Sequence, residues 1–397
     1  MVFCTKIKKK IAIVSNTSWS VYNFRLGLIR RLQESGYEVS IIAPQDNFSA
    51  KLVAEGFNFH HIYTSNYSTN PLNDLRTLFQ LVRIYRKNEF DFIFHYTIKP
   101  NIYGTLAARW CKIPSIAITT GLGRLFSFNN KVVKYLSTKL YQVAAKYSQQ
   151  IWFLNQSDLD SFIGRGITTN KKAFLLPSEG IDTQKFKPKE TYYVNEKKQL
   201  SFLFAGRVIW DKGVKEFVEA AKIIKREYKN IEFQMLGFID PSNPNAVPYE
   251  DIQKWQKRNI ISYLGETEDV RPYLDDSSCL VFPSFYNEGI SRILLEAAAM
   301  AKPIITTDNV GCRDVVKDNY NGFICKIKDK NDLVLKIRKF MTLTQKEQEL
   351  MGLNGRKVVL ENFNEEQIIK IYTDYLSSHF KQNQNRKTTL IYSASKN

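Results

Sequence analysis

The stretch LSFLFAGRVIWDKGVKEFVEAAKIIKREY (200–228) indicates the fold class of this 397-residue chain. Its first residues (200–206) form an apolar run of the kind found in a buried strand, and after a short loop the apolar residues of 214–228 recur with the period of a helix. A second apolar run, IEFQMLG (231–237), follows at once. This order predicts two parallel strands joined by a right-handed crossover helix.

The same alternation extends on both sides of this stretch. We expect further strands at 9–15, 38–44, 90–96, 114–120, 150–155, 261–265, 279–284, 303–307 and 322–327. We expect further helices at 23–35, 71–88, 101–111, 132–148, 249–258, 269–277 and 289–301. The polar segment 187–199 divides the pattern in two and is typical of a linker.

The chain is therefore predicted to be an α/β protein with two doubly wound parallel sheets in tandem. The first Rossmann-like domain is expected at 1–190 and the second at 191–363. An amphipathic helix at 364–380 would pack back on the first domain, and the polar tail at 381–397 is expected to be disordered. Ligands of such sheets bind beyond the carboxyl ends of the strands.

Composition limits the class of protein and the compartment in which we expect it. No window approaches the roughly 18 apolar residues of a membrane span, and the start, MVFCTKIKKKIAIVS, does not resemble a signal peptide. The five cysteines include no C-x-x-C pair, as expected of reduced thiols in a cytoplasm, and the four histidines form no zinc-like cluster.

The net charge of +18 is concentrated in the N-terminal half, where residues 1–190 hold 26 Lys/Arg and 12 Asp/Glu. Such an excess attracts nucleic acid, anionic lipid or a phosphorylated substrate, and a solvated basic surface is the alternative interpretation. The chain has no RNP, KH or helix-turn-helix signature, so the charge alone does not make it a nucleic-acid-binding protein.

Two acids in FPSFYNEGISRILLEA (282–297) are candidates for ligand contacts. We expect Glu288 at a helix N-terminus, with Gly289 allowing close approach of a ligand to the backbone. Glu296 would lie about 12 Å farther along the same helix face. Glycosidase carboxylate pairs are about 5–9.5 Å apart, so this spacing favours contacts at the two ends of an extended ligand, although two ordinary helix acids would look the same.

Two cations in FAGRVIWDKGVKEF (204–217) follow the first strand of the second domain. Arg207 and Lys212 would lie near the carboxyl end of that strand, where a diphosphate would be neutralised by charge-assisted hydrogen bonds. Surface charge on a strand–helix loop is the alternative interpretation.

Together, the G-R-x4-K-G loop, the segment E-G-x-x-R-x-L-L-E-A and TTDNVGCRDVVKDNYNGFIC (306–325) resemble the family 4 retaining glycosyltransferases of GT-B fold. The resemblance covers nearly the whole chain. It implies a nucleotide-sugar donor, usually UDP-linked, and no required metal or other cofactor. The second domain would bind the donor and the first the acceptor. The resemblance implies these donor-site residues: catalytic Arg207, Lys212 and Glu288, with Gly289, Ile290, Glu296, Leu264 and Gly265 as binding residues.

Within those roles, the cations would hold the diphosphate, Glu288 the transferred sugar and Glu296 the ribose. Leu264 and Gly265 would face the base through backbone groups. The expected reaction retains the anomeric configuration, by front-face attack in which the leaving diphosphate helps to deprotonate the acceptor.

The N-terminal half is similar to bacterial enzymes that extend undecaprenyl-diphosphate-linked glycans, among them N-acetylgalactosaminyltransferases acting on diacetylbacillosamine. The segments SNTSWSVYNFRLGLIRRL (15–32), HYTIKPNIYG (95–104) and TTGLGRLF (119–126) carry this likeness. In this chain Thr120 stands where relatives often have a His before Gly121. The candidate acceptor contacts are Ser18, Ser20, Tyr22, Asn23, Arg25, His95 and Lys99, although His95 is as readily a core residue.

The basic, aromatic stretch 124–148 could lie on an anionic membrane surface or simply cover the sheet. We expect a monomer or weak dimer in the cytoplasm, peripheral on the inner face of the plasma membrane, acting on a lipid-linked sugar and not on nucleic acid. A soluble sugar or protein acceptor is the alternative. The D-x-D at Asp158 and Asp160 follows a helix-start signal and is therefore not assigned to a metal.

Overall fold

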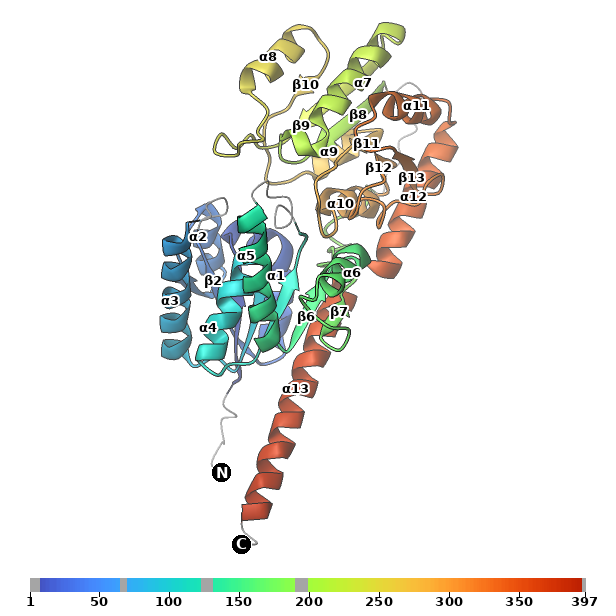
Figure 1. Ribbon diagram of the computed structural model, residues 1–397. Helices are drawn as coiled ribbons and strands as arrows, with labels where there is room; N and C mark the ends of the chain where they lie inside the picture. The colour runs from blue at the N-terminus through green and yellow to red at the C-terminus, as the bar shows by residue number, and fades with distance from the viewer. Residues whose placement is uncertain (1–7, 65–69, 123–130, 190–198, 395–397) are drawn as a thin grey trace.

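A computed structural model describes the chain except for residues 1–7, 65–69, 123–130, 190–198 and 395–397. It has two α/β domains, one above the other in Figure 1, and a long C-terminal helix that runs from the second domain down along the first. Among the described residues, no helix combines the length and apolar character needed to cross a bilayer.

The N-terminal domain is built on a parallel sheet with the strand order β3-β2-β1-β4-β5-β6-β7. The strands are β1 (Lys10–Val14), β2 (Glu38–Ala43), β3 (Asn58–His61), β4 (Phe92–Tyr96), β5 (Ser115–Thr119), β6 (Gln150–Phe153) and β7 (Ala173–Leu175). The helices are α1 (Ser18–Glu34), α2 (Asn47–Ala54), α3 (Pro71–Asn88), α4 (Thr105–Trp110), α5 (Lys131–Tyr147) and α6 (Gln156–Gly164), with a π-helical turn, η1 (Pro100–Gly104), before α4.

Alternate residues of the central strands enter cores on opposite faces of this sheet. Ile13 packs in the core beneath α1, whereas Val14 packs in the core beneath α3 and α4. The helices α3, α4 and α5 thus cover one face, and α1 with the C-terminal helix covers the other. The carboxyl ends of the strands point toward the second domain (Figure 1).

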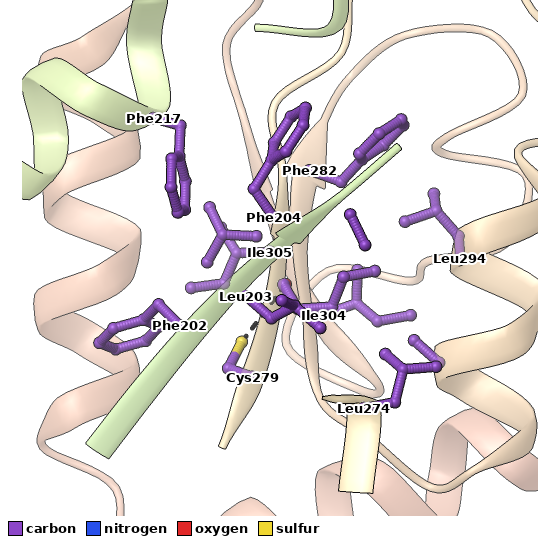
Figure 2. Close-up of a cluster of buried hydrophobic side chains, with 14 of the residues drawn as sticks. Phe202, Leu203, Phe204, Phe217, Leu274, Cys279, Phe282, Leu294, Ile304 and Ile305 are labelled. Carbon is purple, nitrogen blue, oxygen red and sulfur yellow. Dashed lines mark hydrogen bonds between the residues drawn. The ribbon is translucent and has the colours of Figure 1, made fainter. Parts of the chain in front are cut away.

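The C-terminal domain repeats the plan with the strand order β10-β9-β8-β11-β12-β13. The strands are β8 (Leu200–Ala205), β9 (Ile231–Leu236), β10 (Ser262–Tyr263), β11 (Cys279–Phe282), β12 (Ile304–Thr307) and β13 (Gly322–Cys325). The helices are α7 (Val214–Glu227), α8 (Tyr249–Lys257), α9 (Arg271–Asp276), α10 (Arg292–Ala299), α11 (Lys330–Met341) and α12 (Gln345–Asn362), with a 3₁₀ turn, η2 (Trp210–Lys212), before α7. Figure 2 shows Phe202, Phe204 and Phe282 of the central strands with Phe217 and Leu294 of the covering helices.

The chain returns to the first domain through α13 (Glu365–Ala394). Ile368, Ile369, Tyr372 and Leu376 are buried in the N-terminal core. The Tyr96 hydroxyl donates to the Tyr372 hydroxyl at 3.1 Å, so the two segments share polar as well as apolar contacts.

The helix at the start of the chain and the one at its end differ from expectation, and six elements were not among the expected strands and helices: α2, β3, α6, β7, α11 and α12. The helix expected at 23–35 begins at Ser18, because the Thr17 side chain caps it by accepting from the Ser20 amide. Strand β3 and helix α2 are too short to stand out as periodic segments in the sequence. The tail expected to be disordered from 381 continues α13 as far as Ala394, and no glycine or proline interrupts the helix there.

Candidate active site

The loop after β8 places Lys212 at the carboxyl edge of the second sheet. Gly206 ends the strand with a positive φ, and Gly213 ends the 3₁₀ turn in the left-handed region. A Cβ on Gly213 would lie only 2.1 Å from the Pro283 carbonyl oxygen, so glycine is required for the close approach of this loop to the end of β11.

This approach brings Lys212 and Glu288 together in an ion pair. The Lys212 side chain is buried, with its Nζ 4.9 Å from the centroid of the Tyr286 ring and 5.3 Å from that of Phe282. Burial, and next the charge of Arg207, hold the pKa of Lys212 well below its usual value. An ammonium group has three donors, so Lys212 can hold Glu288 and still donate to a phosphate oxygen.

Arg207 is exposed near this pair. Its guanidinium carbon lies 5.4 Å from the centroid of the Tyr286 ring. Tyr286 therefore has both predicted cations against its ring. Tyr286 was not among the predicted site residues, and a single tyrosine in a loop gives no sequence signal.

The predicted helix start at Glu288 is wrong. Helix α10 begins at Arg292 and Ser291 is its N-cap residue, so Glu288 lies in the preceding loop. The separation of about 12 Å assumed one continuous helix between the two acids and therefore does not apply. The backbone leaves the helical path here because Ser291 donates its amide to the Gly311 carbonyl at 3.0 Å.

Glu296 faces a different partner. Its carboxylate accepts from Arg292 Nε at 3.2 Å, one helical turn away, and Arg292 also donates to the Gly180 carbonyl in the segment that joins the domains. Burial raises the pKa of Glu296, and Arg292 opposes this shift. Arg292 is a site residue that the sequence did not single out, although its spacing of four residues from Glu296 is a helical ion-pair signal.

Leu264 and Gly265 follow β10 at the same edge. The Leu264 amide donates to the Met235 carbonyl at 2.8 Å, and the Gly265 carbonyl accepts from the Gly237 amide at 2.7 Å. The Leu264 amide and the Gly265 carbonyl are therefore already hydrogen-bonded within the second domain. A nucleotide base could use only the other backbone groups of these two residues.

Gly289 and Ile290 lie where the two domains touch. The Gly289 amide donates to the Thr120 carbonyl at 3.2 Å, and a Cβ on Gly289 would lie 2.8 Å from that same oxygen. Ile290 packs against the cores of both domains. The close approach expected at Gly289 therefore occurs, but the backbone of the first domain makes it.

The predicted acceptor residues of the first helix are mostly engaged within their own domain. The Ser18 hydroxyl donates to the Pro44 carbonyl at 2.6 Å, the Ser20 hydroxyl lies 2.9 Å from that of Ser15, and Asn23 donates to the Trp19 carbonyl at 2.9 Å. Tyr22 packs against the N-terminal core. These residues lie in the first turns of α1 and not in a loop, because Thr17 caps the helix; their contact with an acceptor stays a prediction.

Arg25, His95 and Lys99 are also partnered inside the first domain. Arg25 is buried, pairs with Glu179 and lies over the Tyr96 ring at 4.0 Å. Lys99 pairs with Asp74 at 2.7 Å. These contacts engage all three side chains within the first domain.

His95 is a core residue. It is completely buried, with Nε2 3.0 Å from the Tyr85 hydroxyl and Nδ1 3.3 Å from that of Thr105. Burial lowers the pKa of His95 to about 3, so the ring is neutral at physiological pH. Its place one residue before the end of β4 directs it toward η1 and not toward the second domain.

Asp158 and Asp160 do not form a metal site. Asp158 accepts from the Asn155 side chain at 3.1 Å, whereas Asp160 accepts from Gln156 at 2.7 Å. Throughout the described part of the chain, no group of three His, Cys, Asp or Glu side chains is arranged to hold a metal ion.

Two family models cover most of the chain. Residues 186–358 match the glycosyl transferases group 1, and residues 10–155 match a glycosyl transferase 4-like family. Solved structures include a glycosyltransferase from Rickettsia africae that is 18% identical, with a TM-score of 0.77 over 94% of this chain and 99% of that one. At this identity the structural likeness concerns the fold alone.

Two curated relatives are named for lipid-linked substrates. The chain is 32% identical over 343 residues, 83% of its length and 88% of the relative's, to the N,N'-diacetylbacillosaminyl-diphospho-undecaprenol alpha-1,3-N-acetylgalactosaminyltransferase of Campylobacter jejuni. It is 24% identical over 84% of its length, and 87% of the relative's, to the UDP-Gal:alpha-D-GlcNAc-diphosphoundecaprenol alpha-1,3-galactosyltransferase of Escherichia coli.

Proposed function

This chain belongs to the group 1 glycosyl transferases, and we propose that it is a retaining enzyme that transfers a hexose or N-acetylhexosamine from a UDP-sugar to a polyprenyl-diphosphate-linked acceptor. The observation that carries this proposal is the buried Lys212–Glu288 pair between the two domains, at the carboxyl edge of the second sheet. The two relatives' names supply the substrate class, a sugar linked to undecaprenol through a diphosphate, and we propose that this chain acts in bacterial surface-glycan assembly.

In the proposed donor complex, Arg207 and Lys212 neutralise the diphosphate, and no metal is required. Glu288 contacts the transferred sugar, with Gly289 and Ile290 beside it. A buried carboxylate paired with an ammonium favours a sugar hydroxyl as its next partner, because that hydroxyl donates to the oxygen without adding charge. If this is right, saturating EDTA leaves the initial rate of transfer unchanged.

Glu296 is proposed to bind the ribose diol. Its carboxylate is held by Arg292, and burial raises its pKa, so a donor hydroxyl would complete its hydrogen bonds. Leu264 and Gly265 would frame the base with the backbone groups that the sheet does not use.

The proposed reaction occurs on one face of the sugar. The bond from the anomeric carbon to the diphosphate breaks, a bond to the acceptor oxygen forms on the same face, and the leaving diphosphate takes the acceptor proton. Arg207 and Lys212 stabilise the charge that develops on the leaving group, so the protein acts mainly by positioning and electrostatics.

We place the lipid-linked acceptor and an anionic inner-membrane surface on the side of the first domain covered by α3, α4 and α5. Helix α5 exposes an apolar stripe at helical spacing, and α3 exposes a second one. The exposed apolar side chains of this face are Leu72, Leu75, Phe79, Trp110, Leu136, Leu140, Val143 and Tyr147. The basic side chains beside them are Arg76, Arg83, Arg86, Arg109, Lys139 and Lys146.

This mixture is what an interfacial element needs, because apolar side chains enter the headgroup boundary while cations attract anionic lipid. Tyr141, predicted as part of the basic, aromatic stretch, instead lies in the core and accepts from Asn101 at 2.8 Å. Phe126 and Phe128 of that stretch lie outside the described residues. The peripheral location and a monomeric or weakly dimeric state remain part of the proposal.

A thermal-shift screen of UDP-, GDP- and dTDP-sugars tests the donor. At about 100 times Kd a ligand stabilises by about 2.7 kcal/mol, which raises Tm by roughly 5 °C for a domain of this size. We expect this shift with UDP-sugars, its loss in Glu296→Ala, and its retention in Glu349→Ala, which removes an exposed acid of α12. Absence of any shift in the wild type contradicts the donor assignment.

Flotation with vesicles containing anionic lipid tests the membrane face. The double variant Leu136→Glu/Val143→Glu should abolish binding, whereas Leu335→Glu should not, since Leu335 is equally exposed but lies on α11. If the wild type does not bind vesicles and transfers to a soluble sugar or protein, the acceptor is soluble.

A further inference from the structure

Asn155 makes hydrogen bonds in both domains. It is buried, and its Oδ1 accepts from the Asp158 amide at 2.7 Å, which caps α6. Its Nδ2 lies 2.9 Å from the Gly289 carbonyl oxygen and 3.4 Å from that of Glu288. One side chain of the first domain therefore holds the peptide that carries Glu288.

The same peptide is held from a second direction. The Gly289 amide donates to the Thr120 carbonyl, and a Cβ on Gly121 would lie 2.6 Å from the Gly289 nitrogen. On the other side a Cβ on Gly311 would lie 2.9 Å from the Gly289 carbonyl oxygen. The segment at Gly289 is thus enclosed by backbone on both sides, and the Asn155 amide is the side-chain donor to its carbonyl.

We propose that Asn155 is a positioning residue for transfer: it fixes the Glu288–Gly289 peptide when the domains are together, and so aims the Glu288 carboxylate at the reacting sugar. This inference rests on the proposed role of Glu288. Asn155 itself acts through the backbone and touches neither Lys212 nor the Glu288 carboxylate.

A capping role alone does not explain this geometry. A cap requires only an acceptor for the amides of the first turn, and Ser, Thr and Asp provide one as well as Asn does. The amide nitrogen of Asn155 carries two hydrogens: it donates to the Asp158 carboxylate at 3.1 Å within its own domain and to the Gly289 carbonyl at 2.9 Å in the other. Without this second bond the buried Gly289 carbonyl would lose its side-chain donor, which is unfavourable. Of the good capping residues, only asparagine accepts through one atom and donates through a second, so it can cap the helix and still reach a carbonyl in the other domain.

If Asn155 is a positioning residue, its replacement should lower turnover and have little effect on the affinity for the donor. Arg207, Lys212 and Glu296, which are proposed to bind the nucleotide, lie in the second domain and do not contact Asn155. Loss of one positioning hydrogen bond in a buried site corresponds to about a tenfold fall in kcat, with the KM for the donor changed by less than about twofold.

The test compares Asn155→Ser with Asn70→Ser. Serine can still cap α6 but is too short to reach Gly289, and Asn70 caps α3 by accepting from the Leu72 amide at 3.0 Å. Asn155→Thr, which also supplies a capping oxygen and is too short to reach Gly289, serves if the serine variant folds poorly. We expect near-wild-type Tm in all three variants and the fall in kcat only in the two at Asn155.

Hydrogen exchange gives a readout that does not depend on activity. Amides of 285–291 should exchange faster in Asn155→Ser, while those of α6 stay protected; unchanged exchange at 285–291, or full turnover, overturns the inference. If Asn155 only capped α6, serine would replace it and hydrogen exchange would be unchanged in both segments. A wild type that transfers no sugar contradicts the proposed function, and the exchange result still decides the role of Asn155.

Discussion

Replacement of Gly289 by alanine should separate closure of the two domains from folding of either one. The φ angle of Gly289 is not positive, so alanine fits the backbone there. Its Cβ would lie 2.8 Å from both the carbonyl carbon and the oxygen of Thr120, and 3.0 Å from Leu154 Cδ1. All of these atoms belong to the first domain, so the conflict arises only when the domains are together.

The geometry sets the size of the effect. Ordinary contacts to carbon are about 3.5 Å, so the domains must separate locally by roughly 0.7 Å. That movement lengthens the 3.2 Å bond from Gly289 to Thr120 and the 2.9 Å bond from Asn155 to Gly289. Two such bonds contribute about 2 kcal/mol, which lowers the closed population about thirtyfold.

The assay is steady-state transfer together with the thermal stability of each variant. We expect Gly289→Ala to lower kcat/KM about thirtyfold with Tm within about 2 °C of the wild type. The matched control is Gly164→Ala, because a Cβ at Gly164 meets nothing within 4 Å. Wild-type turnover in Gly289→Ala would refute the reasoning, since the close contact would then not form during catalysis.

Three further outcomes follow from the site and its surroundings. Lys212→Ala leaves Glu288 without its partner and should lower kcat at least a hundredfold with an unchanged circular dichroism spectrum; retained turnover removes Lys212 from the diphosphate site. Burial raises the pKa of Asp158 from 3.8 to about 7, so the folded state holds a proton that the unfolded state has lost, and the free energy of unfolding falls as pH rises from 4 to 7 by up to about 4 kcal/mol; denaturant titrations of Asp158→Asn should lack this slope. His95→Ala should lower the free energy of unfolding by about 2–4 kcal/mol with turnover per folded molecule unchanged, and the reverse pattern would make His95 a catalytic residue.

The fold and the family were predicted from the sequence and are confirmed. Parallel strands buried on both faces read as continuous apolar runs, and long crossover helices carry a clear period. Short elements such as β3 (Asn58–His61) give too few residues for a pattern.

The sequence predicted residues that meet at the candidate site, but it misplaced the starts of the helices α1 and α10. Lys212 and Glu288 are each followed by a glycine where two backbone segments approach closely, which is a signal visible in the sequence. The structure brings the two side chains into contact. The start of α10 was misplaced because the Ser291 amide donates to the Gly311 carbonyl, and no local propensity encodes a contact between residues so far apart in the sequence. The start of α1 was misplaced because one hydroxyl, that of Thr17, extends the helix by more than a turn.

The return of α13 to the first domain has a consequence for synthesis of the chain. Residues that complete the N-terminal core, such as Tyr372 and Leu376, leave the ribosome only after the whole second domain has been made. Until then the apolar face formed by Phe94 and Trp152 lacks its cover. A truncation near 363 should therefore yield aggregating protein even though the whole second domain is present, and an affinity tag belongs at the N-terminus.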